Sequence, residues 1–179
     1  MRQIRKPRQL RKHILVVCEG ETEEAYFSLL RKHFRLPIKI KIHVAGQGIC
    51  KRDLDSYKAD IDSVSASMID TFLVYDADVE SVVSALSKLE GRPLLTNPCF
   101  EFWLMLHTGD YSKSISTAGA LKRLCESASV WANYKKGILT AAQEKHLIEN
   151  LDYACQRARK LKGNPSSEIY LFIDHLRSL

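Results

Sequence analysis

The chain has 179 residues, of which 45% are hydrophobic and 27% are charged, with a formal net charge of +6. A chain of this length can bury about two thirds of its unfolded surface, so one domain needs no disulfide or metal to fold. No run of about 18 apolar residues is present, which argues against a membrane span. The five scattered cysteines include no C-x-x-C pair of the kind that binds zinc. We expect a cytoplasmic protein whose basic balance favours an anionic partner, nucleic acid before membrane.

The first twelve residues form a basic arm without a single acid. Its cations are Arg2, Arg5, Lys6, Arg8, Arg11 and Lys12. Such an arm can neutralise phosphates, and it can equally be a solvated tail. We expect residues 1–12 to be a segment distinct from the folded domain.

Residues 13–110 alternate between strand and helix patterns. The continuous apolar runs 13–18 and 71–75 predict strands covered on both faces, whereas residues 38–44 alternate apolar and basic side chains and predict an edge strand. Three helices and then a short strand are expected over residues 22–35, 51–67, 79–89 and 92–95. This order predicts an α/β fold of the three-layer Rossmann type, with a mostly parallel sheet.

The remaining sequence has helical patterns. Four helices are expected, over residues 99–108, 116–129, 140–161 and 166–177. Gly163-Asn164-Pro165 separates the last two, because glycine and proline end helices. We expect residues 111–179 to form a C-terminal helical region packed on the α/β core of residues 13–110.

Two of the apolar strands end in acids. Glu19 follows the first, and Asp76-Ala77-Asp78 ends the second. Ligands bind beyond the carboxyl ends of parallel strands, and side chains two apart in an extended segment point the same way. Mg²⁺ and Mn²⁺ prefer carboxylate oxygens and supply Lewis acidity for phosphoryl chemistry. The pattern predicts a metal-dependent phosphodiesterase built on Glu19, Asp76 and Asp78.

Two other functions also fit the sequence pattern. Asp76-Ala77-Asp78-Val79 formally fits the nucleophile motif of haloacid-dehalogenase-like phosphatases, although that motif normally follows the first strand and no downstream acidic pair is evident. A non-catalytic subunit that only binds nucleic acid or a partner protein would also carry a basic surface.

Longer motifs add a resemblance to a known family. Residues 17–27 (VCEGETEEAYF), 75–78 (YDAD) and 96–107 (TNPCFEFWLMLH), with a late Asn164-Pro165, resemble the RloB-like family, whose core is similar to the Toprim fold. The resemblance implies a Mg²⁺- or Mn²⁺-dependent nuclease, the effector of an antiphage defence system controlled by an ATPase partner. It also implies RNA, such as tRNA, in preference to DNA; a homodimer is left open.

Further site residues are expected around these acids. Glu101 is either a helix-start acid or a metal ligand or orienter of the site, and Glu23 is a further candidate ligand. The resemblance to the RloB-like family also implies that Lys136, or its neighbour Lys135, is a candidate for stabilising charge on the scissile phosphate. Thr22 is expected to cap the helix that follows Glu19. The late cluster Arg157, Arg159, Lys160 and Lys162 is expected to offer phosphate contacts.

Overall fold

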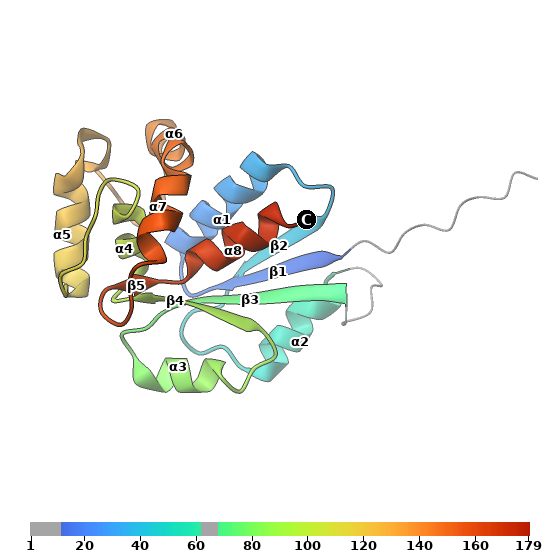
Figure 1. The fold of residues 1–179 in the computed structure, drawn as a ribbon. Coiled ribbons are helices and arrows are strands. Elements are labelled where there is room, and N and C mark those ends of the chain that lie inside the picture. The colour runs from blue at the N-terminus through green and yellow to red at the C-terminus, as the bar shows by residue number, and fades with distance from the viewer. Residues whose placement is uncertain (1–11, 62–67) are drawn as a thin grey trace, which may run out of the picture.

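The computed structural model describes residues 12–61 and 68–179, so residues 1–11 of the basic arm and the end of the expected helix 51–67 lie outside the described residues. A single five-stranded sheet runs in the order β2-β1-β3-β4-β5 (Figure 1). The first four strands are parallel, and β5 is antiparallel to β4. The strands are β1 (His13–Cys18), β2 (Lys39–Val44), β3 (Ile69–Asp76), β4 (Arg92–Asn97) and β5 (Ser166–Ser167).

Helices cover both faces of the sheet, which confirms the expected three-layer α/β fold. Figure 1 shows α2 and α3 below the sheet, and α1, α8 and the helices of the C-terminal region on the other side. The helices are α1 (Glu21–Phe34), α2 (Lys51–Ala59), α3 (Glu80–Leu86), α4 (Phe100–Met105), α5 (Thr117–Ser127), the 3₁₀ helix η2 (Ser129–Trp131), α6 (Ala141–Glu149), α7 (Leu151–Ala158) and α8 (Ile169–Arg177).

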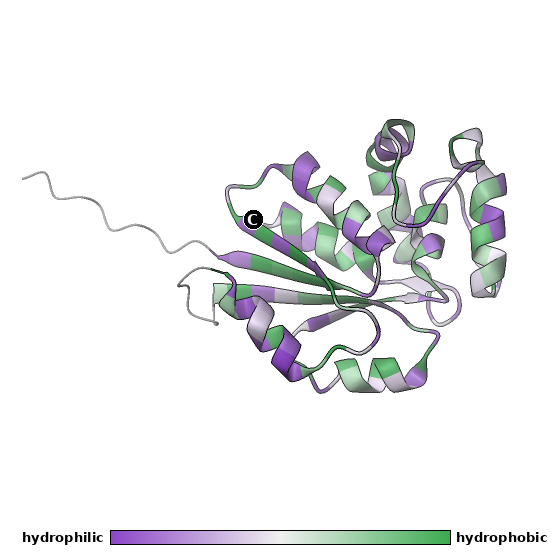
Figure 2. Cartoon of the chain, turned by 180° about the vertical axis from the view of Figure 1, so that it is seen from behind, coloured by the Kyte–Doolittle hydropathy of each residue, from purple (hydrophilic) through white to green (hydrophobic). Residues whose placement is uncertain are grey.

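The period of two along β1 divides the core into two layers. Ile14, Val16 and Cys18 belong to the apolar cluster under α1, α4 and α8, whereas Leu15 and Val17 belong to the cluster under α2 and α3. All five side chains are fully buried, because helices cover both faces of the sheet and β1 lies inside it between β2 and β3. Figure 2 shows largely hydrophobic central strands between helices in which hydrophilic and hydrophobic residues alternate.

The C-terminal region packs firmly on this sheet. The ring of Phe172 on α8 lies 4.8 Å from that of Phe27 on α1 and 4.9 Å from that of Phe72 on β3, measured between centroids. The apolar side chains of α4 are buried as expected, including Phe102 and Trp103. Within the described part of the chain, no helix is long and apolar enough to cross a membrane.

Two features of the C-terminal region differ from the expectation. The helix expected over 140–161 is two helices that meet at Asn150, whose side-chain amide donates to the His146 carbonyl at 2.9 Å, a local bond that competes with helix continuation. Strand β5 was not expected, because two residues carry no periodicity. Glu168 fixes it against β4, since its backbone N donates to Leu95 O at 2.9 Å and its carboxylate accepts from Leu95 N at 3.1 Å.

The strand order places a crevice at a defined point. From β1 the chain passes through α1 to β2 on one side, and from β3 it passes through α3 to β4 on the other. The connections after β1 and β3 therefore leave in opposite directions from neighbouring strands. Open α/β sheets bind ligands outside the carboxyl ends of the strands at such a switch point.

Candidate acidic site

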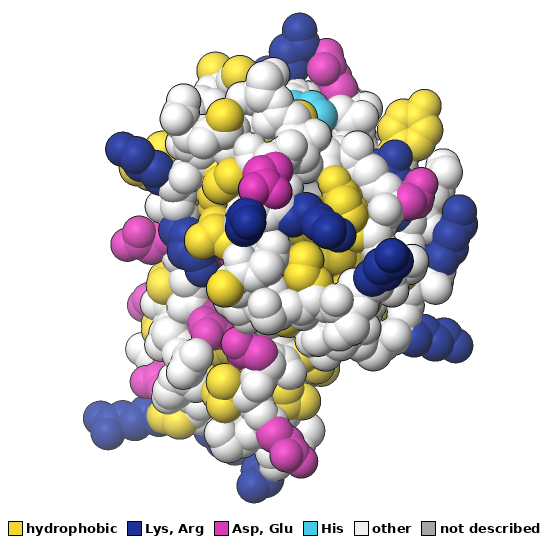
Figure 3. Space-filling model, turned by 90° about the vertical axis from the view of Figure 1, so that its left-hand side faces the viewer, with side chains coloured by type: hydrophobic (Ala, Val, Ile, Leu, Met, Phe, Trp, Pro, Cys, Tyr) yellow, Lys and Arg dark blue, Asp and Glu magenta, His cyan; other side chains and the backbone are white. Residues whose placement is uncertain are grey.

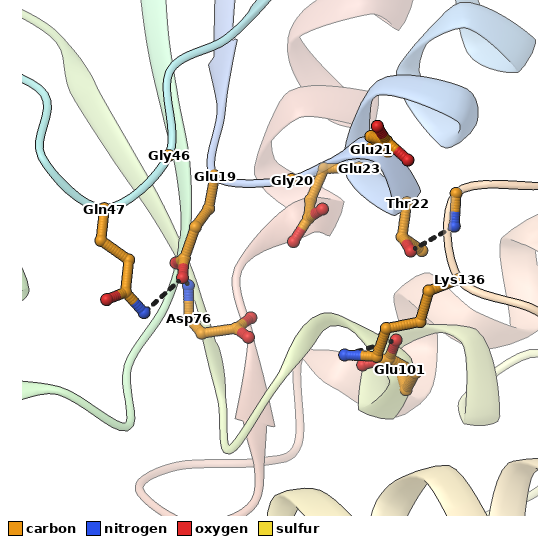
Figure 4. A pocket seen from close by; sticks show the side chains of 11 residues that line it. Glu19, Gly20, Glu21, Thr22, Glu23, Gly46, Gln47, Asp76, Glu101 and Lys136 are labelled. Carbon is orange, nitrogen blue, oxygen red and sulfur yellow. Dashed lines mark hydrogen bonds and ion pairs between the residues drawn. The ribbon is translucent and has the colours of Figure 1, made fainter.

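A pocket of about 310 Å³ lies at the carboxyl ends of β1 and β3 (Figure 4). Segments far apart in the sequence meet there: the start of α1, the loop after β2, the end of β3, the first turn of α4 and the loop before α6. Its lining residues are Glu19, Gly20, Glu21, Thr22, Glu23, Gly46, Gln47, Asp76, Glu101, Lys136 and Gly137.

Glu19 is held by hydrogen bonds on both carboxylate oxygens. Its Oε2 accepts from the backbone N of Asp76 at 3.1 Å, and its Oε1 accepts from Gln47 Nε2 at 2.9 Å. The Glu19 backbone N donates to Val74 O at 3.0 Å, which continues the pairing of β1 with β3 beyond the end of β1. The carboxylate of Glu19 is therefore fixed beside Asp76.

Asp76 and Glu23 are acids whose charged forms are disfavoured. Burial, and then the charges of Glu23 and Glu19, raise the pKa of Asp76 to about 8. Burial, together with the charges of Glu101 and Glu19, raises the pKa of Glu23 to about 7, against a backbone hydrogen bond and the charge of Lys136, which lower it. The Oδ1 atom of Asp76 is buried and has no hydrogen-bond partner among the described residues. Such groups are stabilised by a cation, which removes the repulsion between them.

Glu101 is the most buried acid of the pocket, with 2% of its surface exposed. Its Oε1 accepts from the Tyr134 hydroxyl at 3.2 Å and lies 3.3 Å from Lys136 Nζ. Burial tends to lower the pKa of Lys136, but the charge and hydrogen bond of Glu101 raise it above its usual value. The lysine is thus held as a cation at the wall of the pocket (Figure 4).

The loop that carries Lys136 is a tight turn. Ile138 N donates to Lys135 O at 3.3 Å, and Gly137 inside the turn has φ +77°, a left-handed conformation that glycine adopts without strain. A Cβ atom at Gly137 would also come within 2.8 Å of Glu21 Oε2. This close approach brings Lys136 against the start of α1.

The carboxylates of the pocket suit a hard divalent cation by their chemistry. Glu19, Glu23 and Asp76 offer oxygen donors, and Asp76 Oδ1 is an orphaned buried acceptor. Over residues 12–61 and 68–179, no three acidic, His or Cys side chains already stand at a spacing that would hold one ion. The fit rests on donor type, the raised pKa values of Asp76 and Glu23, and the unpartnered oxygen.

Five of the six expected site residues meet in the pocket: Glu19, Glu23, Asp76, Glu101 and Lys136. Asp78 does not line it and is exposed, although its charge still contributes to the raised pKa of Asp76. The alternation of an extended strand stops at Asp76, and Ala77 and Asp78 lie in a bend, so Asp78 does not repeat the direction of Asp76.

Two pocket residues were missed or misread in the sequence. Gln47 is not among the predicted site residues, although its loop follows β2 and must therefore reach the same edge of the sheet as Glu19. Thr22 was expected to cap α1, but Gly20 occupies the cap position, and the Thr22 hydroxyl accepts from Gly137 N at 2.9 Å. No local pattern reveals a bond between residues 115 positions apart.

Part of the late basic cluster is bound within the molecule. Arg157 donates to Leu106 O at 2.7 Å and pairs with Asp110 at 3.4 Å, and Arg159 pairs with both oxygens of Asp174. These two arginines join helices of the C-terminal region, so the expectation that they offer phosphate contacts has little geometric support. Lys160 and Lys162 are exposed.

The mostly parallel sheet with helices on both faces defines a Rossmann-like three-layer α/β protein, and its acidic pocket lies at the switch point. A family model described as RloB-like protein matches residues 14–176, and the chain belongs to this RloB-like family. Comparisons with curated proteins and with solved structures found no match.

Proposed function

We propose that the protein is a Mg²⁺- or Mn²⁺-dependent nuclease that hydrolyses phosphodiester bonds in the pocket at the switch point. The observation that carries the proposal is the meeting of Glu19, Glu23 and Asp76 at one wall with the cation Lys136 at another. Acids with raised pKa values favour a divalent cation, and a lysine opposite them favours an anionic substrate.

The residues divide into distinct roles in this proposal. A bound cation would supply Lewis acidity and lower the pKa of its water, with Asp76, Glu23 and, as the sequence predicts, Asp78 as candidate ligands. Glu19, fixed by Gln47 and the Asp76 backbone, is placed to accept a proton or orient the attacking water. Lys136 stabilises charge that develops on the phosphate.

A hydrolysis assay tests this function against its alternatives. The purified chain with Mg²⁺ or Mn²⁺ is expected to cleave tRNA or single-stranded RNA more readily than duplex DNA, and not to prefer p-nitrophenyl phosphate. Preference for that small monoester would favour a phosphatase of the haloacid-dehalogenase type. Tight polynucleotide binding without turnover, with or without a partner protein, would favour a non-catalytic subunit.

The family suggests how such an activity is restrained. We propose a cytoplasmic effector of antiphage defence whose nuclease is controlled by an ATPase partner, because a freely active nuclease would damage its own cell. A homodimer is compatible with this arrangement. We therefore expect the ATPase to change kcat of the nuclease, while the same pocket residues remain necessary for cleavage.

A basic groove on α5 is a candidate contact for the substrate backbone. It has a volume of about 340 Å³ and is lined by Lys113, Ser114, Ile115, Gly119, Lys122, Arg123 and Glu126. Lys122 pairs weakly with Glu126 at 3.9 Å, whereas Lys113 and Arg123 make no ion pair within the described residues. Figure 3 faces the end of the molecule where α5 lies. More lysines and arginines are visible in the upper part of this view, on the side of the C-terminal helices, than in the lower part.

Charge reversal in this groove is expected to weaken RNA binding. In the double variant Lys113→Glu/Arg123→Glu, each lost phosphate contact should reduce the salt slope of log K by about 0.7, the value for single strands. Fluorescence anisotropy with a labelled RNA in EDTA measures this without turnover. Arg52→Glu/Lys88→Glu is the matched control, because both residues are exposed on the opposite layer of the sheet. Equal losses in the two double variants would show that only net charge matters.

A further inference from the structure

We infer that Thr22 and Tyr134 are positioning residues, whose hydroxyl groups hold the Lys136 loop against the acidic pocket. The inference deepens the proposed function, since it rests on Lys136 as the cation that faces the phosphate. Neither hydroxyl is expected to touch the substrate. Their role is to decide where the lysine from the C-terminal region stands relative to acids from the sheet.

The hydrogen bonds form one directed chain. Gly137 N donates to Thr22 Oγ1 at 2.9 Å, and the Tyr134 hydroxyl donates to Glu101 Oε1 at 3.2 Å. Thr22 Oγ1 lies 3.4 Å from Tyr134 Oη. Because the tyrosine proton is used on Glu101, the threonine must be the donor in this contact. Lys136 Nζ closes the chain on the same Glu101 oxygen at 3.3 Å.

The hydroxyl groups and the carboxylate in this series of hydrogen bonds are buried, so their bonds are costly to break, whereas the Lys136 side chain at its end is 60% exposed. Thr22 is 6% exposed, Tyr134 9% and Glu101 2%. Removing either hydroxyl leaves a buried donor or acceptor without its partner, whereas the intact chain satisfies every member. Directed polar chains of this kind fix one geometry, and here the geometry fixed is that of the turn at Lys135–Ile138.

The contacts also assign a role to Glu101. Its Oε1 already receives the tyrosine hydroxyl and the lysine ammonium, so it acts as an anchor for Lys136. Of the roles expected for Glu101, namely helix-start acid, metal ligand or orienter of the site, the geometry points to the orienter. The site therefore combines acids from the α/β core with a lysine from the C-terminal region. A shift of the C-terminal region would move Lys136 away from the acids.

Lysine reactivity measures this positioning without any need for turnover. Thr22→Val keeps the shape of the side chain and loses the hydroxyl, and Tyr134→Phe loses only the hydroxyl. Each is expected to raise acetylation of Lys136 by limiting acetic anhydride roughly three- to ten-fold, since a fall of about one unit in the pKa of an amine raises its neutral fraction about ten-fold. Fragment-ion mapping separates Lys136 from the exposed Lys135, which serves as the internal reference.

Two controls make the result specific. Thr22→Ser retains the hydroxyl and should keep the ratio of Lys136 to Lys135 acetylation near that of the wild type. Thr108→Val removes a hydroxyl that bonds Met105 O and Tyr111 Oη elsewhere on the molecule, and should leave the ratio unchanged. An unchanged ratio in Tyr134→Phe, or an equal rise in Thr108→Val, would overturn the inference. If Thr22→Val does not fold, Tyr134→Phe carries the test alone.

Hydrolysis gives a second and separable readout. With an RNA substrate, Thr22→Val and Tyr134→Phe should lower kcat and kcat/KM together with little change in KM, the pattern of an interaction made in the transition state. Thr22→Ser should restore kcat. If the variants raise the reactivity of Lys136 but the wild-type protein hydrolyses no substrate, the positioning role stands and the nuclease function is rejected. If the variants lose kcat but the reactivity of Lys136 is unchanged, the nuclease function stands and the positioning role is rejected.

Discussion

Replacing Glu19 by Gln is expected to lower metal-dependent cleavage roughly 10²- to 10⁴-fold, the range for a general acid–base group. The amide oxygen of the variant can still accept from Asp76 N, and its NH2 group can donate to the oxygen of Gln47 once the Gln47 amide turns over, so the side chain should keep its place in the pocket. Asp76→Asn should lose cleavage to a similar extent for a different reason, because it weakens the binding of the cation. Single-turnover cleavage of RNA measures the first effect, and the increase in Tm on adding Mn²⁺ measures the second.

The division of roles follows from comparing the two variants. Glu19→Gln should keep much of the Mn²⁺-dependent increase in Tm, whereas Asp76→Asn should lose it. Glu24→Gln and Asp55→Asn are matched controls, since both acids are exposed and neither lines the pocket. Equal loss of metal stabilisation in Glu19→Gln and Asp76→Asn would contradict separate roles. Full cleavage by Glu19→Gln would remove Glu19 from the chemistry.

Without metal, the acidic pocket should make the protein less stable as pH rises. The pKa of Asp76 is about 8 and that of Glu23 about 7 in the folded chain, against roughly 4 for such acids in an unfolded chain. Between these limits the folded state binds more protons than the unfolded state. The stabilisation is therefore complete below about pH 4 and is lost as the pH rises toward 8.

Asp76→Asn should accordingly be more stable than the wild type at alkaline pH. A pKa about four units above its unfolded value, at about 1.36 kcal/mol per unit, corresponds to a gain on the order of 5 kcal/mol in the free energy of unfolding at pH 8.5, which falls toward zero only below about pH 4. Urea unfolding of both proteins in EDTA at several pH values measures this difference, in which the titration of groups distant from Asp76 cancels. Saturating Mn²⁺ should reverse the order at pH 8.5, because the cation stabilises the ionised acids only in the wild type. A difference that does not change with pH would show that Asp76 titrates normally.

Local pattern alone predicted most of the sheet. The apolar runs at 13–18 and 71–75 became the buried strands β1 and β3, and the alternating run at 38–44 became the edge strand β2. Side-chain period reports directly whether one or both faces of a strand are covered, so these assignments need no tertiary information. The strand β5 was missed because two residues carry no periodicity and their pairing with β4 is a long-range contact, and the break at Asn150 was missed because it involves a local side-chain bond.

The sequence pattern predicted only part of the candidate site. Glu19 and Asp76 were found because each ends an apolar strand, and the edge at which parallel strands end is common to them all. Asp78 was grouped with Asp76 on the assumption that the strand continues, but the chain bends after Asp76. Lys136 was proposed from family resemblance and not from pattern.

By itself, then, the sequence determined the three-layer α/β fold and the acids at the ends of β1 and β3, because burial and strand period are local properties. Only the tertiary structure decided which distant groups join those acids: Gln47 on Glu19, Tyr134 on Glu101, and Gly137 on Thr22. These bonds connect residues 28, 33 and 115 positions apart, and their partners lie in loops without periodicity. The pKa values of Asp76 and Glu23 belong to the same class, since burial and neighbouring charges exist only once the chain has folded.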